Sequence, residues 1–292
     1  MDLSTSLESL TNEHSEHTID EKSGEEVLHI DSSHTLIQAA GYLKYELAKR
    51  DNKNVYFRGQ RKIYDTLRPS LFRGIKRTNK LQDWRDKINN FIDNIHDKGN
   101  ALRAVRKGCS EALLQHYGIK TTWIDVVDNI WVALWFSCHR AMTYGSPEKY
   151  LHFERREPDY YRSERPEYAY ILLMASANQP SNNFPGHYKD DDTETIDLRV
   201  AAPSNFVRPH AQHGVLVRKL SINGLPVGDC SDMHVGTIRI DLPTALTWIG
   251  SAKTLDSHSL FPPAFYDYGY RELLEDINPD DKELGAIDRI QA

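Results

Sequence analysis

The amino-acid sequence predicts a single α+β domain in which a mixed, mainly antiparallel sheet carries a helical block on one side. Two segments with helical spacing follow one another and lead into a short apolar segment and a further helix. Short apolar segments of strand length recur in the second half of the chain, separated by Gly, Pro and Asn turn signals. The length of 292 residues suffices for one large domain or two small ones.

Both ends of the chain are polar. Residues 1–26 contain eight Asp or Glu residues against one Lys, and such a composition cannot bury a core, so we expect a disordered acidic leader. The residues after Asn278 are also polar. The expected organisation is therefore a leader over 1–26, the domain over 27–277 and a polar C-terminal tail over 278–292.

In the first half of the domain, apolar residues from Leu36 to Leu47 repeat with helical spacing, and the predicted helix runs to Arg50. A strand is expected at 55–60, followed by an irregular loop over 64–74 that is packed by its own apolar side chains. Two more helices are expected, one starting at Leu81 and one over 101–117.

The second half alternates strands with polar segments. Strands are predicted at 168–174, 196–200, 214–217 and 237–240, and a helix is predicted from Pro243 to about Lys253. The polar segments at 144–167 and 177–195 are interpreted as loops, and the aromatic-rich stretch 264–275 is expected to dock back on the domain.

Composition and motifs argue against several classes of protein. A net charge of −6 does not favour a non-specific nucleic-acid binder. Cys109, Cys138 and Cys230 are far apart, which argues against a disulfide framework and fits a reducing cytoplasm. Neither a signal peptide nor an apolar run of membrane-spanning length is evident. The motifs GxGxxG, GxxxxGK[ST], HExxH and GxSxG are absent.

The stretch 115–138 is the most informative part of the chain. A helix ends at Gln115 and His116, and Gly118 is a natural helix terminator because it can adopt positive φ. A short buried segment carrying Thr121, Thr122 and Asp125 follows, and a strongly apolar helix comes directly after it. A polar turn held between two apolar elements is a typical place for a functional site.

Four motifs, in this order and spacing, resemble the FRG domain, a bacterial family named after its Phe/Tyr-Arg-Gly motif. The resemblance covers roughly residues 30–275. Its motifs are Phe57-Arg58-Gly59-Gln60 followed by 67–73, 114–118 followed by Thr121 and Asp125, 209–214, and 260–262. Two departures stand out: Thr122 occupies a position where Arg is common, and 263–268 replace an acidic Asp-Leu-Asp.

The first motif is also similar to the strand of ADP-ribosyltransferases that ends in Tyr-Arg-Gly. This resemblance implies that NAD is the substrate and that Arg58, Gly59 and Gln60 hold it, since a guanidinium suits phosphate oxygens and Gly permits close backbone approach. Further cofactor-binding residues are predicted in the second motif. They are Gln115, Thr121 and Thr122.

The catalytic residues that the resemblance suggests are Asp125, His116 and Gln212. Gln212 stands where a catalytic carboxylate is expected, and as a neutral side chain it cannot replace one, so Asp125 is the best alternative acid. The family context implies a cytoplasmic bacterial or phage-related defence effector or toxin. Its partners would be a small-molecule nucleotide, a protein or nucleic-acid acceptor and a restraining partner protein, without a membrane.

Other interpretations stay open from the sequence. The same residues, with Arg208, suit a non-catalytic module that senses a nucleotide or phosphorylated ligand. A nuclease or other hydrolase is a second alternative, with His116, Asp125, His139, His210 and His213 as the available ligands, although no metal site is predicted. Arg58 and Asp125 could also form a structural bridge without any ligand.

Overall fold

The computed structural model describes residues 15–75, 80–145, 150–158, 166–250, 255–277 and 283–290. Within these ranges the strands are β1 (Ser15–Ile19), β2 (Glu26–Ile30), β3 (Lys53–Gln60), β4 (Ile124–Val127), β5 (His139–Tyr144), β6 (Tyr150–Arg155), β7 (Tyr168–Ala177), β8 (His187–Lys189), β9 (Thr193–Asp197), β10 (Gly214–Lys219), β11 (His234–Asp241) and β12 (Arg289–Ile290).

The helices of the same ranges include three long ones, α2 (Ser33–Asp51), α3 (Leu81–Lys98) and α4 (Lys107–His116). Shorter helices follow, and they are α5 (Ile130–Cys138), α6 (Leu198–Ala201), α7 (Val207–Ala211), α8 (Leu242–Ile249), α9 (Ser257–Leu260) and α10 (Tyr268–Asp276), with the 3₁₀ turns η1 (Ser70–Phe72) and η3 (Ser231–Met233). No helix in the described part of the chain is long and apolar enough to cross a membrane.

The described strands form a nine-stranded sheet in the order β1-β2-β11-β7-β3-β4-β10-β9-β8, and a three-stranded sheet in the order β12-β6-β5. The pairs are antiparallel except for β2 with β11 and β6 with β12. The predicted α+β class with a mixed, mainly antiparallel sheet is therefore confirmed.

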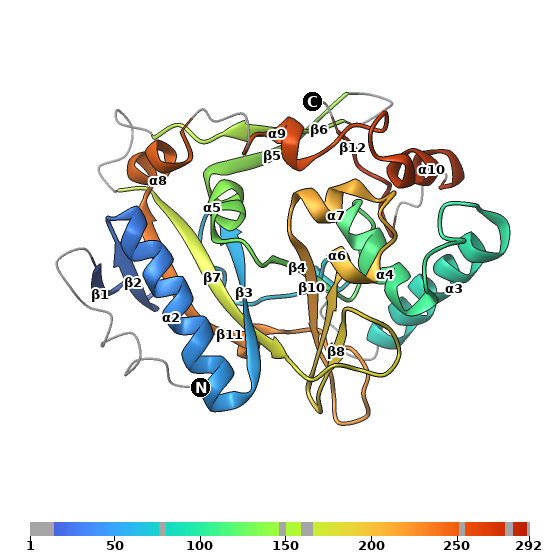
Figure 1. Ribbon diagram of the computed structural model, residues 1–292, viewed down its shortest axis with the longest axis horizontal. Helices are drawn as coiled ribbons and strands as arrows, with labels where there is room; N and C mark the ends of the chain where they lie inside the picture. Colours follow the sequence, from blue (N-terminus) through green and yellow to red (C-terminus); the bar gives the residue numbers. More distant parts are fainter. Residues whose placement is uncertain are drawn as a thin grey trace.

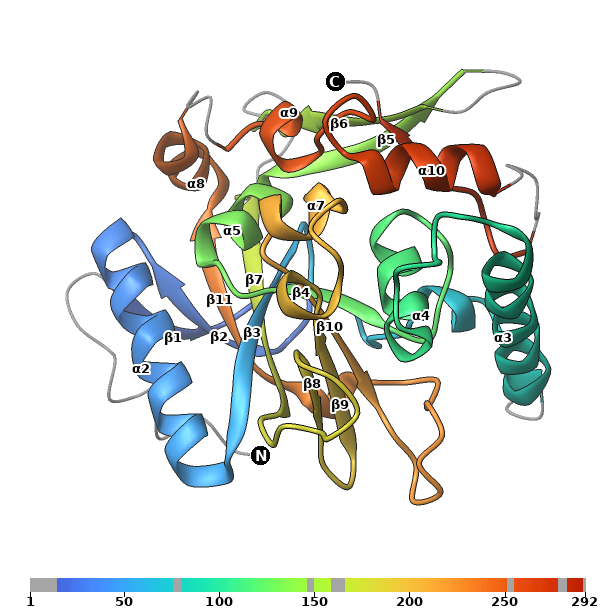
Figure 2. The same cartoon turned by 45° about the vertical axis from the view of Figure 1, so that its right-hand side comes forward.

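Among the described residues, three apolar cores pack against the large sheet, and the third of them lies on β3, β4, β7 and β10. In the first, α2, α5 and α8 cover strands β2, β3, β7 and β11. In the second, α3, α4, α6 and α10 pack together against the half of the sheet that contains β9 and β10, and these helices form the predicted helical block. Figure 1 shows the two groups of helices on opposite sides of β3 and β4, and Figure 2 turns the second group forward.

Secondary structure is present in both segments that the sequence suggested to be a leader and a tail. Residues 1–14 of the expected leader lie outside the described residues, but β1 falls within that leader and pairs with β2 over its whole length. At the other end, the expected polar tail contains the buried Leu284 and Ile287 and adds β12 to the small sheet. Backbone pairing with β2 holds β1, whose apolar residue Ile19 is 61% exposed, whereas buried apolar side chains hold the C-terminal segment.

Several elements of the second half also differ from expectation. The expected loop 144–167 contains β6, which pairs with β5 in a hairpin, because cross-strand partners outweigh the polar composition. Residues 198–201 form α6 rather than continuing a strand, since Asp197 caps that helix through the backbone amide of Arg199. The helix expected over 101–117 begins only at Lys107.

The two halves of the large sheet meet at a narrow contact between β3 and β4. Phe57 and Val127 are the residues that pair there, whereas β3 and β7 pair along their whole length from Lys53 to Gln60. Beyond Phe57 the two strands diverge, so Arg58 and Gly59 lie at the point where the sheet opens. The cleft that forms at this opening carries the candidate site.

Candidate functional site

Gly59 allows helix α5 to lie directly on strand β3. A Cβ atom at position 59 would stand 1.8 Å from the carbonyl oxygen of Ala133 and 2.8 Å from the amide nitrogen of Ser137. Any side chain there would push the helix away from the strand. Packing thus explains the glycine of the Arg-Gly pair, because glycine lets α5 pack closely on β3. The arginine beside it points into the cleft.

Arg58 is fixed by two contacts with neutral oxygen atoms. Its Nη1 donates to the backbone carbonyl of Asp125. Its Nε donates to the side-chain oxygen of Gln60 at 3.0 Å, in the amide orientation that satisfies both ends of that glutamine. Burial lowers the pKa of Arg58, and the charge of Arg73 lowers it further, although Asp125 acts in the opposite direction.

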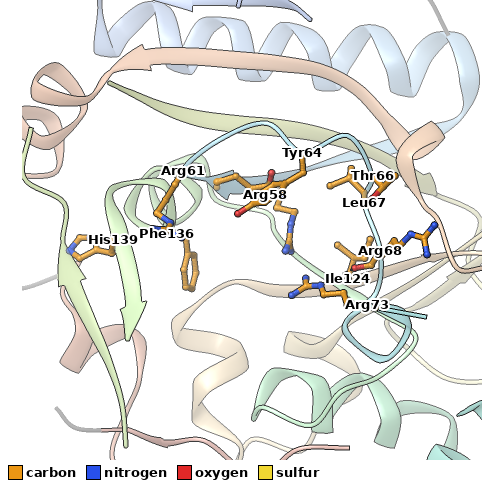
Figure 3. A pocket seen from close by; sticks show the side chains of 13 residues that line it. Arg58, Arg61, Tyr64, Thr66, Leu67, Arg68, Arg73, Ile124, Phe136 and His139 are labelled. Atoms are coloured by element: carbon orange, nitrogen blue, oxygen red, sulfur yellow. Dashed lines mark hydrogen bonds between the residues drawn. The ribbon is translucent and has the colours of Figure 1, made fainter. Parts of the chain in front are cut away.

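The outer part of the cleft is a pocket of about 500 Å³ that we call the arginine pocket. Four arginines line it, and no acidic side chain of the described residues does; the arginines are Arg58, Arg61, Arg68 and Arg73. Figure 3 shows Arg58 and Arg73 extending toward one another across this pocket, whereas Arg68 turns away from them. Like charges that face one another favour an anion between them.

The inner part of the cleft is a cavity of about 470 Å³ that we call the inner pocket. It shares part of its wall with the arginine pocket, so the two are continuous; the shared residues are Arg58, Gly59, Arg73, Phe136 and His139. Deeper in, its polar lining differs from that of the outer pocket. This lining comprises Ser70, Gln115, His116, Asp125, Arg208, Gln212 and Asp288.

Asp125 is held at the floor of the inner pocket by a chain of hydrogen bonds. The amide of Gln115 donates to its Oδ2 at 2.6 Å, and the oxygen of Gln115 accepts from Ser70 at 2.8 Å and from Thr121 at 2.7 Å. Burial alone would raise the pKa of Asp125, but His116, Gln115 and the charge of Arg58 outweigh it and hold the pKa below its usual range. The carboxylate therefore stays ionised, and 40% of its side-chain surface remains open to the pocket.

His116 stands beside this carboxylate at the end of α4. Its Nδ1 lies 3.7 Å from Oδ1 of Asp125, and its side chain is only 5% exposed. Its Nε2 is buried and has no hydrogen-bond partner among the described residues. His116 therefore acts in the pocket through its Nδ1, which faces the carboxylate of Asp125.

The structure separates the predicted site residues into two groups. Arg58, Gly59, Gln115, His116, Asp125 and Gln212 line the inner pocket, and Gln60 lines the arginine pocket. Thr121 lies behind Gln115 and is fully buried, so it supports the site without lining it. Thr122 belongs elsewhere: its hydroxyl and backbone amide both donate to Glu111 at 2.8 Å.

Gln212 has a structural partner in the fourth motif. Its amide donates to the backbone carbonyl of Leu260 at 2.8 Å and is 4% exposed. This hydrogen bond ties α7 to α9 beside the inner pocket. The glutamine thus joins the third and fourth sequence motifs, which the spacing alone did not reveal.

Arg208 contributes a buried cation that sequence reasoning placed only in the ligand-sensing alternative. The residue is 1% exposed, and its guanidinium lies 4.4 Å from the ring centroid of Tyr117 and 4.6 Å from that of Tyr270. Its Nη1 donates to the carbonyl of His116 at 3.3 Å, whereas Nε and Nη2 have no partner among the described residues. A buried guanidinium with free N–H groups suits a ligand that presents acceptor oxygens.

Asp288 and His139 are lining residues that sequence reasoning did not assign to the NAD site. Asp288 lies in the stretch interpreted as a tail, where no local signal marks it. The ring of His139 stacks on Trp135 at 4.0 Å, and its Nδ1 lies 2.8 Å from the carbonyl oxygen of Trp135. The position of His139, four residues after that tryptophan near the end of the apolar helix, was the only available signal.

The described residues do not support a metal centre. No group of three or more His, Cys, Asp or Glu side chains among them is arranged to hold a metal ion. His213, one of the ligands considered for hydrolytic chemistry, lies near Asn129 and Arg199, with nitrogen–nitrogen distances of 3.5 Å to each, rather than in the inner pocket.

Comparison with protein families identifies one match. Residues 53–145 match the family model of the FRG domain, and the matched range contains the first two of the four motifs, together with β3, α4 and α5. No match was found among curated proteins or among solved structures.

Proposed function

Because the chain carries an FRG domain over residues 53–145, we propose that its cleft binds NAD and transfers the ADP-ribosyl group, with the pyrophosphate in the arginine pocket. The reacting ribose would lie in the inner pocket. The proposal makes the protein an NAD-using enzyme similar to ADP-ribosyltransferases.

The observation that carries the proposal is the change of charge along one continuous cleft. The outer pocket is lined by four arginines and no described acid. The inner pocket shares Arg58 and Arg73 with it and adds Arg208 together with two carboxyl groups, those of Asp125 and Asp288. NAD has a matching charge distribution, because its pyrophosphate is anionic and the positive charge of its nicotinamide ring shifts to the ribose as the glycosidic bond breaks. Carboxylates placed at that end stabilise an oxocarbenium-like transition state.

The residues of the cleft have distinct roles in this proposal. Arg58 and Arg73 bind the phosphates from two sides, and Gly59 lets α5 pack on β3 and so fixes the position of Arg58. The ionised Asp125, held by Gln115, stabilises positive charge at the ribose. His116, whose Nδ1 lies 3.7 Å from Oδ1 of Asp125, supports the negative charge of that carboxylate.

The test uses purified protein and NAD labelled in its adenylate part, with lysate, protein and nucleic-acid acceptors. Turnover or label transfer is compared among the wild type, Arg58→Lys, Arg73→Ala and the control Arg103→Ala, whose exposed side chain lies outside the cleft. We expect activity in the wild type and the control and a loss of at least about tenfold in both cleft variants. Failure to bind or consume NAD would reject the proposal.

A second candidate function is a module that binds a nucleotide or another phosphorylated ligand without turnover. The observation in its favour is that Asp125 and Gln212, two of the predicted catalytic residues, are already engaged by Gln115 and Leu260 respectively. Ligand-induced stabilisation by NAD, ADP-ribose or a nucleoside diphosphate, measured as a thermal shift without turnover, would favour this module.

The biological role that we propose for this activity is that of a defence effector or toxin. If the cleft consumes NAD or modifies a cellular acceptor, expression in a bacterium should slow growth. The comparison is growth with the wild type, with Arg73→Ala and with the Arg103→Ala control, at matched protein levels. Equal growth in all three cultures would contradict toxicity.

A further inference from the structure

The C-terminal segment 283–290 returns to the cleft and is fixed there by its backbone. The amide of Asp288 donates to the carbonyl of Tyr117 at 2.8 Å, and the hydroxyl of Tyr270 donates to the carbonyl of Asp288 at 2.6 Å. The amide of Lys120 donates to the carbonyl of Leu284 at 2.7 Å, and Leu284 is fully buried. Backbone hydrogen bonds and the burial of Leu284 therefore fix the position of Asp288.

The side chain of Asp288 enters the inner pocket across Gly118. A Cβ atom on Gly118 would stand 2.5 Å from Cγ of Asp288 and within 2.8 Å of both carboxyl oxygens. Gly118 has a φ of +111°, so glycine is favoured there on two grounds. The glycine of the second motif thus makes room for a carboxyl group that the chain supplies about 170 residues later.

The carboxyl group of Asp288 faces charges from several elements but has no hydrogen-bond partner among the described side chains. Burial raises its pKa to about 6, the charge of Asp125 adds to this, and Arg208 opposes it. The pKa of Asp125 is lowered instead, so the two carboxyl groups of one pocket differ in their affinity for a proton. The other titratable groups lining this pocket are Arg58, Arg73, His116 and His139.

We propose that Asp288 is the general base of the site and works beside Asp125, which supplies the electrostatic stabilisation. This assignment rests on the NAD chemistry proposed above. The bond between C1′ of the ribose and the nicotinamide nitrogen breaks, and its electron pair leaves with neutral nicotinamide. A water, hydroxyl or amine nucleophile bonds to C1′, and its proton passes to the carboxylate of Asp288.

The different roles of Asp125 and Asp288 follow from the surroundings of each carboxyl group. Asp125 is held by Gln115 and stands beside His116, which favours a permanent negative charge suited to a cationic transition state. Asp288 has no such donors among the residues that the structure describes, so its carboxylate binds a proton more readily and is a stronger base. Gln212, the neutral residue at the position expected to be acidic, then does not need to carry the proton transfer.

The experiment measures the pH dependence of kcat for NAD consumption in the wild type, Asp288→Asn, Asp288→Glu and the control Asp191→Asn, an exposed residue outside the cleft. NAD binding is measured by calorimetry and thermal unfolding by melting at pH 8. We expect the wild type and control to lose activity as the pH falls through about 6. Asp288→Asn should bind NAD with a Kd within about threefold of that of the wild type, but its kcat should be at least about 100-fold lower. Its kcat should also no longer fall as the pH drops through about 6, which is the acid limb of the profile.

The outcomes distinguish this assignment from the function on which it rests. An Asp288→Asn protein with the kcat and pH profile of the wild type would overturn the role of Asp288 and leave the proposed function in place. A wild type that neither binds nor consumes NAD removes both. If Asp288→Asn does not fold, Asp288→Glu gives the same test: a displaced carboxylate should lower kcat and move the acid limb, and an unchanged profile contradicts the proposal.

Discussion

Arg58 and Asp125 meet through a guanidinium and a backbone carbonyl, not through two opposite charges. Nη1 of Arg58 donates to the carbonyl oxygen of Asp125, while the carboxylate of Asp125 turns to Gln115 and His116. The two residues are therefore joined through the backbone of Asp125, while their side-chain charges attract each other across the cleft. Arg58 thus connects β3 to β4 where the two strands diverge, and its guanidinium lines the cleft.

Replacing Gln115 by alanine should destabilise the protein and loosen Asp125. The variant removes one donor from the carboxylate and leaves the hydroxyl groups of Ser70 and Thr121 without their acceptor. We expect the free energy of unfolding to fall by about 1–3 kcal/mol, the range for buried polar groups that lose a partner. Denaturant unfolding measures it, with Gln38→Ala, an exposed position on α2, as the control. Equal effects in both variants would contradict the role of Gln115.

Two glycine-to-alanine variants should have opposite effects. Gly59→Ala places a methyl group 1.8 Å from the carbonyl oxygen of Ala133, so α5 must move, at a cost of at least about 3 kcal/mol. Gly41→Ala lies on α2 with nothing within 4 Å, and it should stabilise the protein by about 0.5–1 kcal/mol, because alanine favours the helix. Thermal and denaturant unfolding compare the two, and a harmless Gly59→Ala would show that the helix does not lie tightly on β3.

Arg73→Ala should weaken the binding of a pyrophosphate-containing ligand without destabilising the fold. The side chain is exposed and lies at the mouth of the cleft, where it contributes charge more than packing. We expect about a tenfold increase in Kd, equivalent to about 1.4 kcal/mol. The increase should shrink as salt rises, because the interaction is screened. Calorimetry with ADP-ribose at two salt concentrations tests this, and an unchanged Kd would place the phosphates elsewhere.

Asp288→Asn should make the protein more stable at pH 8 than the wild type. The folded protein raises the pKa of Asp288 from its usual 3.8 to about 6, so ionisation favours the unfolded chain, and the wild type loses stability as the pH rises from about 4 through 6. The neutral variant does not lose this stability, so its free energy of unfolding should exceed that of the wild type by roughly 1–3 kcal/mol above pH 7. The difference should disappear below pH 4. Unfolding free energies measured across this pH range give the answer. A variant that is less stable at every pH would contradict the cost assigned to this carboxylate.

The sequence by itself determined the local parts of this protein. Periodicity marked the helix that starts near Leu36 and the buried strand at 168–174, because a strong apolar pattern is set by neighbouring residues. The four motifs indicated the FRG resemblance and located Arg58, Gln115, His116 and Asp125, which do line one cavity. Weak local signals failed, as at β6 and α6, where cross-strand pairing and a cap decide the structure.

Only the tertiary structure decided how the cleft is completed. Asp288 and Arg208 come from distant segments. They line the same pocket as His116 because the C-terminal segment folds back onto the domain and α7 packs beside it, and no local sequence pattern encodes either event. Thr121 and Thr122 are adjacent in sequence, yet one supports Gln115 and the other pairs with Glu111. The opening between β3 and β4 has the same origin, since a pairing between strands about 70 residues apart is set by the cores that hold them.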